Sequence, residues 1–90
     1  MARILIIEDE RELAGILKKY LVNAGHQVSL VHKGDEGLLA WKSQRPDLVL
    51  LDLNLPGMDG IEIAKEIRKL GESPIIMLTA LAEEVDQVTG

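Results

Sequence analysis

The sequence predicts an α/β fold in which helices cover both faces of a parallel, doubly wound sheet. Short runs rich in Ile, Val and Leu alternate along the 90 residues with longer segments whose apolar side chains recur every three or four positions. The first kind of segment is typical of buried strands and the second of amphipathic helices. Four such strand and helix units, joined by right-handed crossovers, form one open parallel sheet.

The first strand and helix are expected within residues 3–25. Residues 3–7 (RILII) are apolar after the arginine, as in a strand that is buried on both faces. A helix is predicted over 10–24, and we expect its apolar side chains on one inner face: Leu13, Ile16, Leu17, Tyr20 and Leu21. Gly25 follows directly and predicts the end of this helix, since glycine readily adopts the left-handed conformation that is common there.

The middle of the chain repeats this alternation. A more polar strand is predicted over 27–31 and a second helix over about 34–43. Leu38 and Trp41 share one face of that helix, so Trp41 is interpreted as a half-buried core residue rather than a binding platform. Residues 47–51 (DLVLL) then predict a third buried strand.

The last third of the chain predicts another unit and the start of a further one. A turn-rich stretch over 52–60 leads into a third helix from about 59 to 70. Residues 74–78 (PIIML) indicate a fourth strand, and apolar spacing from residue 81 onward indicates a fourth helix.

Composition narrows the class of protein. Apolar residues make up 47% of the chain, which favours one small domain over 1–90 and no second domain. The formal charge of -5 and the scattered lysines and arginines argue against nucleic-acid binding. We expect a cytoplasmic protein without membrane contact, because cysteine is absent and no apolar stretch has the length of a membrane span. His26 and His32 flank the second strand without a partner at metal-ligand spacing, and are interpreted as solvated turn residues.

Polar residues follow the predicted strands at the points where ligands bind in such sheets. Glu8, Asp9 and Glu10 follow the first strand, Asp52 the third, and Thr79 the fourth. Clustered carboxylates need a counter-ion, and a set of oxygen ligands favours Mg²⁺, Mn²⁺ or Ca²⁺ over zinc. An alternative remains open for the first three acids, which also suit the N-terminus of a helix.

Three segments resemble the motifs of a two-component response-regulator receiver domain of the OmpR-like style. They are IIEDE at the end of the first strand, LVLLDLNLPGMDG from the third strand onward, and IIMLTA at the fourth strand. The match extends over the whole chain in order and spacing. The resemblance implies a flavodoxin-like receiver fold with strand order 2-1-3-4, and a phosphoacceptor module whose partner is a sensor histidine kinase.

The resemblance also implies a role for each candidate site residue. Asp52 is then the phosphoacceptor, and Thr79 is the switch hydroxyl that hydrogen-bonds the phosphoryl group. Asp9 and Asp52 are expected to ligate Mg²⁺ directly, Glu8 through a water molecule, and Asn54 through its backbone carbonyl. Of catalytic activities, we expect at most self-phosphorylation from a phosphodonor and autodephosphorylation.

The sequence departs from the family pattern after the fourth strand. A receiver of this kind is expected to continue with a fifth strand that carries a lysine and with a closing helix, so residues 1–90 are interpreted as an incomplete receiver domain. Two functions remain open: a phosphoacceptor module in two-component signalling, or a structural or folding fragment that lacks efficient phosphotransfer. Because 74–78 is then an edge strand without charge, we expect homo-oligomers that join through it.

Overall fold

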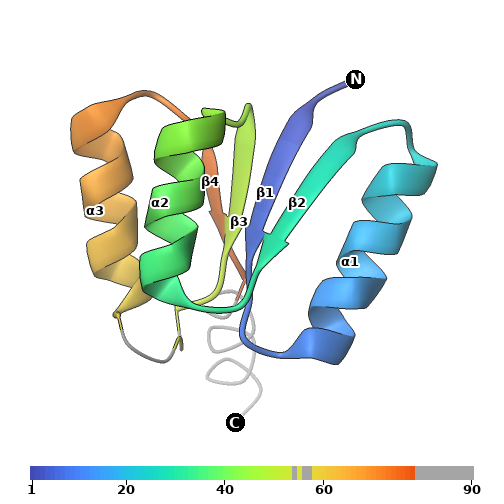
Figure 1. Ribbon diagram of the computed structural model, residues 1–90, viewed down its shortest axis with the longest axis horizontal. Coiled ribbons are helices and arrows are strands. Elements are labelled where there is room, and N and C mark those ends of the chain that lie inside the picture. Colours follow the sequence, from blue (N-terminus) through green and yellow to red (C-terminus); the bar gives the residue numbers. More distant parts are fainter. Residues whose placement is uncertain (54, 56–57, 79–90) are drawn as a thin grey trace, which may run out of the picture.

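The computed structural model describes residues 1–53, 55 and 58–78. Strands and helices alternate there in the predicted order (Figure 1): β1 (Arg3–Ile7), α1 (Arg11–Asn23), β2 (Gln27–Val31), α2 (Gly34–Gln44), β3 (Leu48–Leu51), α3 (Gly60–Leu70) and β4 (Ile75–Met77). The predicted bounds differ from these by at most one residue at either end. The helix expected from residue 81 lies outside the described residues.

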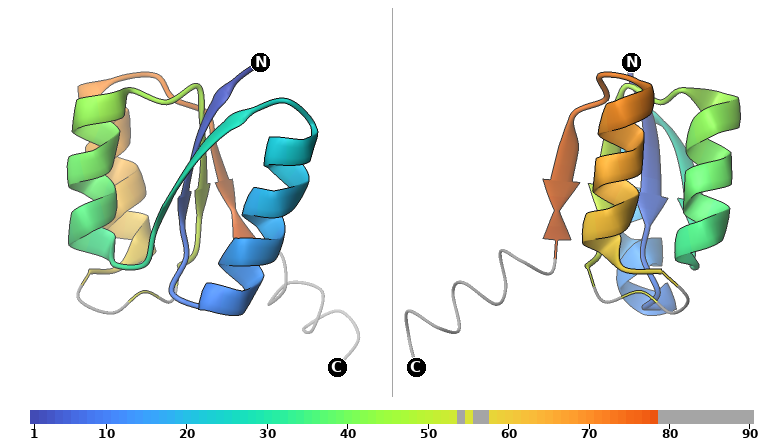
Figure 2. Two further views of the ribbon diagram at one scale, coloured as in Figure 1. Left: turned by 45° about the vertical axis from the view of Figure 1, so that its right-hand side comes forward. Right: turned by 90° about the vertical axis from the view of Figure 1, so that its left-hand side faces the viewer.

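The strands form one parallel sheet in the order β2-β1-β3-β4, which confirms the predicted topology. β1 lies inside the sheet, where Ile4 pairs with Val28 of β2 on one side and with Leu48 of β3 on the other. Helices α2 and α3 cover one face and α1 covers the other (Figures 1 and 2). Because all strands run in the same direction, their carboxyl ends meet at one edge, which is the lower end of the sheet in Figure 1.

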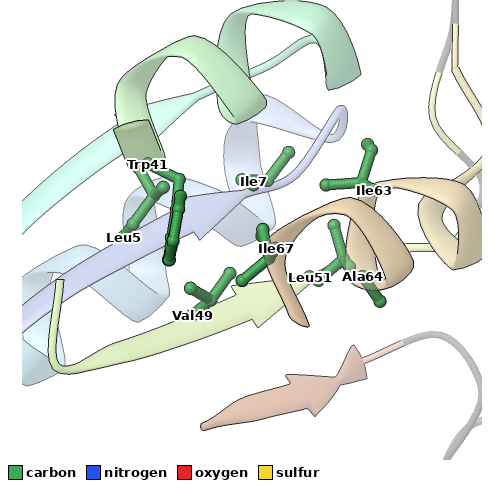
Figure 3. Packing of buried hydrophobic residues seen from close by; sticks show 8 residues of the cluster. All are labelled: Leu5, Ile7, Trp41, Val49, Leu51, Ile63, Ala64 and Ile67. Carbon is green, nitrogen blue, oxygen red and sulfur yellow. The ribbon is translucent and has the colours of Figure 1, made fainter. Parts of the chain in front are cut away.

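The main hydrophobic core lies between the sheet and helices α2 and α3 (Figure 3). Its buried members come from two strands and two helices: Leu5, Ile7, Trp41, Val49, Leu51, Ile63, Ala64 and Ile67. A smaller cluster on the α1 face is centred on Ile4, Ile6 and Leu50. Successive side chains of β1 therefore enter opposite clusters, which explains why its apolar run is continuous.

Trp41 is fully buried, with 1% of its surface exposed, so the prediction of a half-buried residue was wrong. Its Nε1 donates to Ser73 Oγ at 2.8 Å, and the Ser73 hydroxyl donates to the carbonyl of Pro46 at 3.0 Å. The guanidinium of Arg45 lies 4.5 Å from the centre of the indole ring. These partners lie outside α2, so the spacing of apolar residues within that helix gave no sign of them.

Helix α1 uses a narrower face than the sequence suggested. Leu17 and Leu21 pack against the sheet and Ala14 is buried, but Ile16 and Tyr20 are 52% and 74% exposed. Leu13, also expected inside, is exposed as well. Each of the three exposed residues precedes a sheet-facing residue by one position, and one position rotates a side chain by about 100° around the helix. The wide apolar stripe therefore extends beyond the part that touches the sheet.

The residues at two helix termini adopt the capping roles expected of their residue types. Asp59 accepts a hydrogen bond from the amide of Ile61 at 3.0 Å and so caps α3. Gly25, just after α1, has a φ of 95°, which is the left-handed conformation expected of it. Within residues 1–53, 55 and 58–78, no helix has the length and hydropathy needed to cross a bilayer.

Candidate functional site: a buried carboxyl pair

Two acidic side chains meet where β1 and β3 end. Ile7 pairs with Leu51, so the next residues of the two strands, Glu8 and Asp52, are neighbours. The Asp52 amide donates to the carbonyl of Ile7 at 3.0 Å, which continues the ladder to the edge of the sheet. Glu8 is 2% exposed and Asp52 is 7% exposed. The two carboxyl groups that follow these apolar strands are therefore buried.

The side chains of Glu8 and Asp52 are hydrogen-bonded to each other. Two carboxylate groups repel, so this contact requires a proton between them. Burial, then the hydrogen bond with Asp52 and the charges of Asp52 and Glu10, raises the pKa of Glu8 to about 7, although the Glu10 amide opposes the shift. Protonation of Glu8 therefore lessens the repulsion between the two groups.

Backbone groups from both directions hold Glu8. Its amide donates to the carbonyl of Val31 at 3.0 Å, and its Oε2 accepts from the amide of Glu10 at 3.1 Å. The Nδ1 of His32 lies 2.9 Å from the Glu8 carbonyl oxygen. His32 is therefore engaged at the site, and His26, whose Nδ1 accepts from the Ala2 amide at 3.0 Å, is engaged at the opposite end of β2. Both lie in the connections that flank β2, as predicted, but they are half-buried and bonded to backbone groups rather than fully solvated.

Asp9 does not join the buried pair. Its side chain is exposed, and the described residues contain no group of three His, Cys, Asp or Glu side chains that could hold a metal ion. Asn54 and Thr79, the remaining predicted site residues, lie outside the described residues. The structure thus brings together Glu8 and Asp52 of the predicted set.

The chemistry of the donors fits Mg²⁺. The pair offers carboxylate oxygens, which are ligands that hard divalent cations prefer. Both groups are also buried, so a cation bound between them would relieve the repulsion between their ionised forms. The exposed carboxylate of Asp9 follows Glu8 directly in the chain.

Gly60 is a site residue that the sequence reasoning did not single out. A Cβ atom at this position would lie 2.6 Å from the backbone oxygen of Asp52 and 2.7 Å from the Cα of Leu53. The Gly60 amide donates to the Leu53 carbonyl at 3.3 Å, so the start of α3 rests directly on the backbone that follows β3. The available signal was a glycine in the first turn of a helix, where it lowers helix propensity and needs a packing reason.

Comparison with known proteins adds independent findings. Residues 4–90 match the family model described as the response regulator receiver domain. The chain is 41% identical over 90 residues to transcriptional regulatory protein AfsQ1 of Streptomyces coelicolor, and 46% identical over 88 residues to transcriptional regulatory protein BaeR of Escherichia coli. It spans 40% and 37% of the lengths of these two relatives.

A solved structure shows the same fold. The BeF3-activated N-terminal receiver domain of RstA from Klebsiella pneumoniae superposes with a TM-score of 0.80 and 32% identity, over 83% of this chain and 64% of that one.

Proposed function

Because the chain belongs to the family of response regulator receiver domains of two-component systems, we propose that Asp52 accepts a phosphoryl group from a sensor histidine kinase. The observation that carries this proposal is the buried contact between Glu8 and Asp52 at the carboxyl ends of neighbouring strands. In the proposed step, a carboxylate oxygen of Asp52 bonds to the phosphorus of a phosphohistidine. The bond from phosphorus to the histidine nitrogen breaks, and that nitrogen keeps the electron pair.

Glu8, Asp9, Asp52 and Asn54 are the residues proposed to hold Mg²⁺. The ion would supply positive charge that offsets repulsion between the attacking carboxylate and the phosphoryl oxygens. Glu8 has to release its proton before it can serve such an ion, and the Glu10 amide, 3.1 Å from Oε2, supports the ionised form. Thr79 is proposed to hydrogen-bond the phosphoryl group. We therefore also propose a cytoplasmic location, where the sensor kinase would transfer its phosphoryl group.

Intact mass spectrometry tests the proposal. The chain is incubated with Mg²⁺ and a small phosphodonor such as acetyl phosphate, and is then weighed. We expect a mass gain of one phosphoryl group that is lost in Asp52→Asn and kept in Asp35→Asn, which changes an acid in the first turn of α2. No gain at any donor concentration, or an equal gain in Asp52→Asn, would refute the assignment.

A second candidate function is assembly through β4. Within the described residues, this strand pairs only with β3, and Ile76 is 43% exposed on it. The strand is apolar and carries no charge that would discourage pairing with another strand. Under this proposal, two copies join their β4 strands into a continuous sheet.

The oligomeric state tests assembly through β4. Light scattering behind a sizing column should give a dimer whose population rises with concentration, and Ile76→Lys should return it to monomer. A wild-type monomer at high concentration would refute assembly through β4. Metal-dependent phosphorylation in that same monomer would favour the phosphoacceptor function alone.

A further inference from the structure

His32 connects the end of β2 to the carboxyl pair. We infer that its imidazole is a positioning residue, which fixes the peptide between Glu8 and Asp9 and so directs both carboxylates toward a metal ion. This inference rests on the proposed function, because the two carboxylates are proposed metal ligands. Nothing in the family motifs quoted above includes His32.

The contact itself has a defined polarity. The Nδ1 of His32 lies 2.9 Å from the carbonyl oxygen of Glu8. A carbonyl oxygen only accepts hydrogen bonds, so Nδ1 carries the hydrogen and donates it. The neutral ring in this tautomer and the positively charged ring both have that N–H, so the contact does not depend on the charge of His32.

The ring takes the place of a missing backbone donor. The Glu8 amide donates to the Val31 carbonyl at 3.0 Å, which is the last bond between β1 and β2. In a parallel ladder the Glu8 carbonyl would next accept from an amide further along the β2 chain. That chain instead turns into α2 at Gly34. The imidazole of His32 fills the position, and Glu8 is held on both sides of its backbone.

Holding this carbonyl constrains both acids. The carbonyl belongs to the peptide that leads into Asp9, so its orientation sets the direction in which the Asp9 side chain leaves the backbone. The same backbone positions the Glu8 carboxyl between the Glu10 amide and Asp52. Residues that orient metal ligands typically change metal affinity by 10- to 100-fold when they are removed.

Three variants separate positioning from general stability. His32→Ala removes the donor, whereas His32→Asn keeps an N–H on the nitrogen attached to Cγ, the same branch that carries Nδ1 in histidine. His26→Ala is the matched control. It also removes one bond between an imidazole Nδ1 and a backbone group 24 positions away, but at the opposite end of β2.

Two measurements read the site. Calorimetric titration gives the Mg²⁺ affinity, and NMR gives the solvent exchange rate of the Glu10 amide, which bonds to the Glu8 carboxyl in the metal-free protein. We expect His32→Ala to bind Mg²⁺ about tenfold more weakly and to exchange the Glu10 amide faster. His32→Asn should restore both to within about twofold, and His26→Ala should change neither while lowering the melting temperature.

Several results would overturn the inference. These are unchanged affinity and exchange in His32→Ala, an equal loss in His26→Ala, or no restoration in His32→Asn. If the wild-type chain binds no Mg²⁺, the proposed metal dependence fails. The exchange rate of the Glu10 amide then still decides whether His32 positions Glu8.

Discussion

Glu8→Gln should remove a pH dependence of stability that the metal-free protein owes to its buried carboxyl pair. Burial, and then the hydrogen bond with Asp52, raises the folded-state pKa of Glu8 from an ordinary value of 4.5 to about 7. Between these pH values the folded protein keeps a proton that the unfolded chain releases. The stabilising contribution of Glu8 is therefore fully present below pH 4.5, decreases as the pH rises, and is lost above about pH 7.

The size of the effect follows from the two pKa values. The difference between 4.5 and about 7 corresponds to about 3 kcal/mol of unfolding free energy. Part of this difference comes from the neighbouring Asp52, whose side chain is hydrogen-bonded to that of Glu8. The difference is large against the total of about 5–15 kcal/mol that is typical of small domains. Asp52→Asn, which removes the like charge and keeps the shape, should stabilise the metal-free protein modestly.

Urea unfolding in EDTA, repeated at several pH values, measures this dependence. The fluorescence of Trp41, the sole tryptophan, reports unfolding because the ring is buried in the core. Other groups also titrate, so the informative quantity is the slope of stability against pH in the wild type minus the slope in Glu8→Gln. Glu62→Gln, which changes an exposed acid on α3, should keep the wild-type slope.

Equal slopes in Glu8→Gln and the wild type would contradict the reasoning. A clear loss of stability in Asp52→Asn would show instead that Asp52 is a structural hydrogen-bond acceptor.

The metal and the packing contacts lead to further expected outcomes. In calorimetry, millimolar Mg²⁺ should raise the melting temperature of the wild type more than that of Asp9→Ala, and equal shifts would exclude Asp9 from the site. In urea melts, Gly60→Ala should cost about 1–3 kcal/mol, because its Cβ would lie 2.6 Å from backbone oxygen. Gly15→Ala, whose Cβ would have nothing within 4 Å, should instead raise the free energy of unfolding by about 0.5–1 kcal/mol. Equal stability of the Gly60→Ala and Gly15→Ala proteins would contradict the predicted clash at Gly60. Ser73→Ala should cost about 1–3 kcal/mol by thermal melts, since the buried Trp41 N–H loses its acceptor, and a loss near zero would mean that water replaces the hydroxyl.

The fold could be predicted from the sequence because its signals are local. The apolar run of β1, the spacing within each helix and the stop at Gly25 each depend on residues close in the chain. The environments of Ile16 and Trp41 could not be predicted in this way. Both depend on which neighbouring element reaches the helix, and that is settled only by tertiary packing.

Part of the candidate site could also be predicted from the sequence. The contact between Glu8 and Asp52 follows from two strands that end side by side, once their order is assumed. Asp9, one residue beyond Glu8, is exposed where the chain leaves the sheet on its way to α1. The roles of His32 and Gly60 were not predictable from motifs, because each contacts backbone atoms that a distant segment brings close.

The interior position of β1 has a consequence for the order of folding events. β1 must close one loop to reach β2, where Arg3 pairs with Gln27, and a loop almost twice as long to reach β3, where Ile4 pairs with Leu48. The longer closure costs about 0.6 kcal/mol more in chain entropy, so β1, α1 and β2 should associate first. Asp52 reaches Glu8 only in the later step. A metal ion that binds this pair therefore cannot stabilise the first association, because Asp52 is not yet beside Glu8 at that stage.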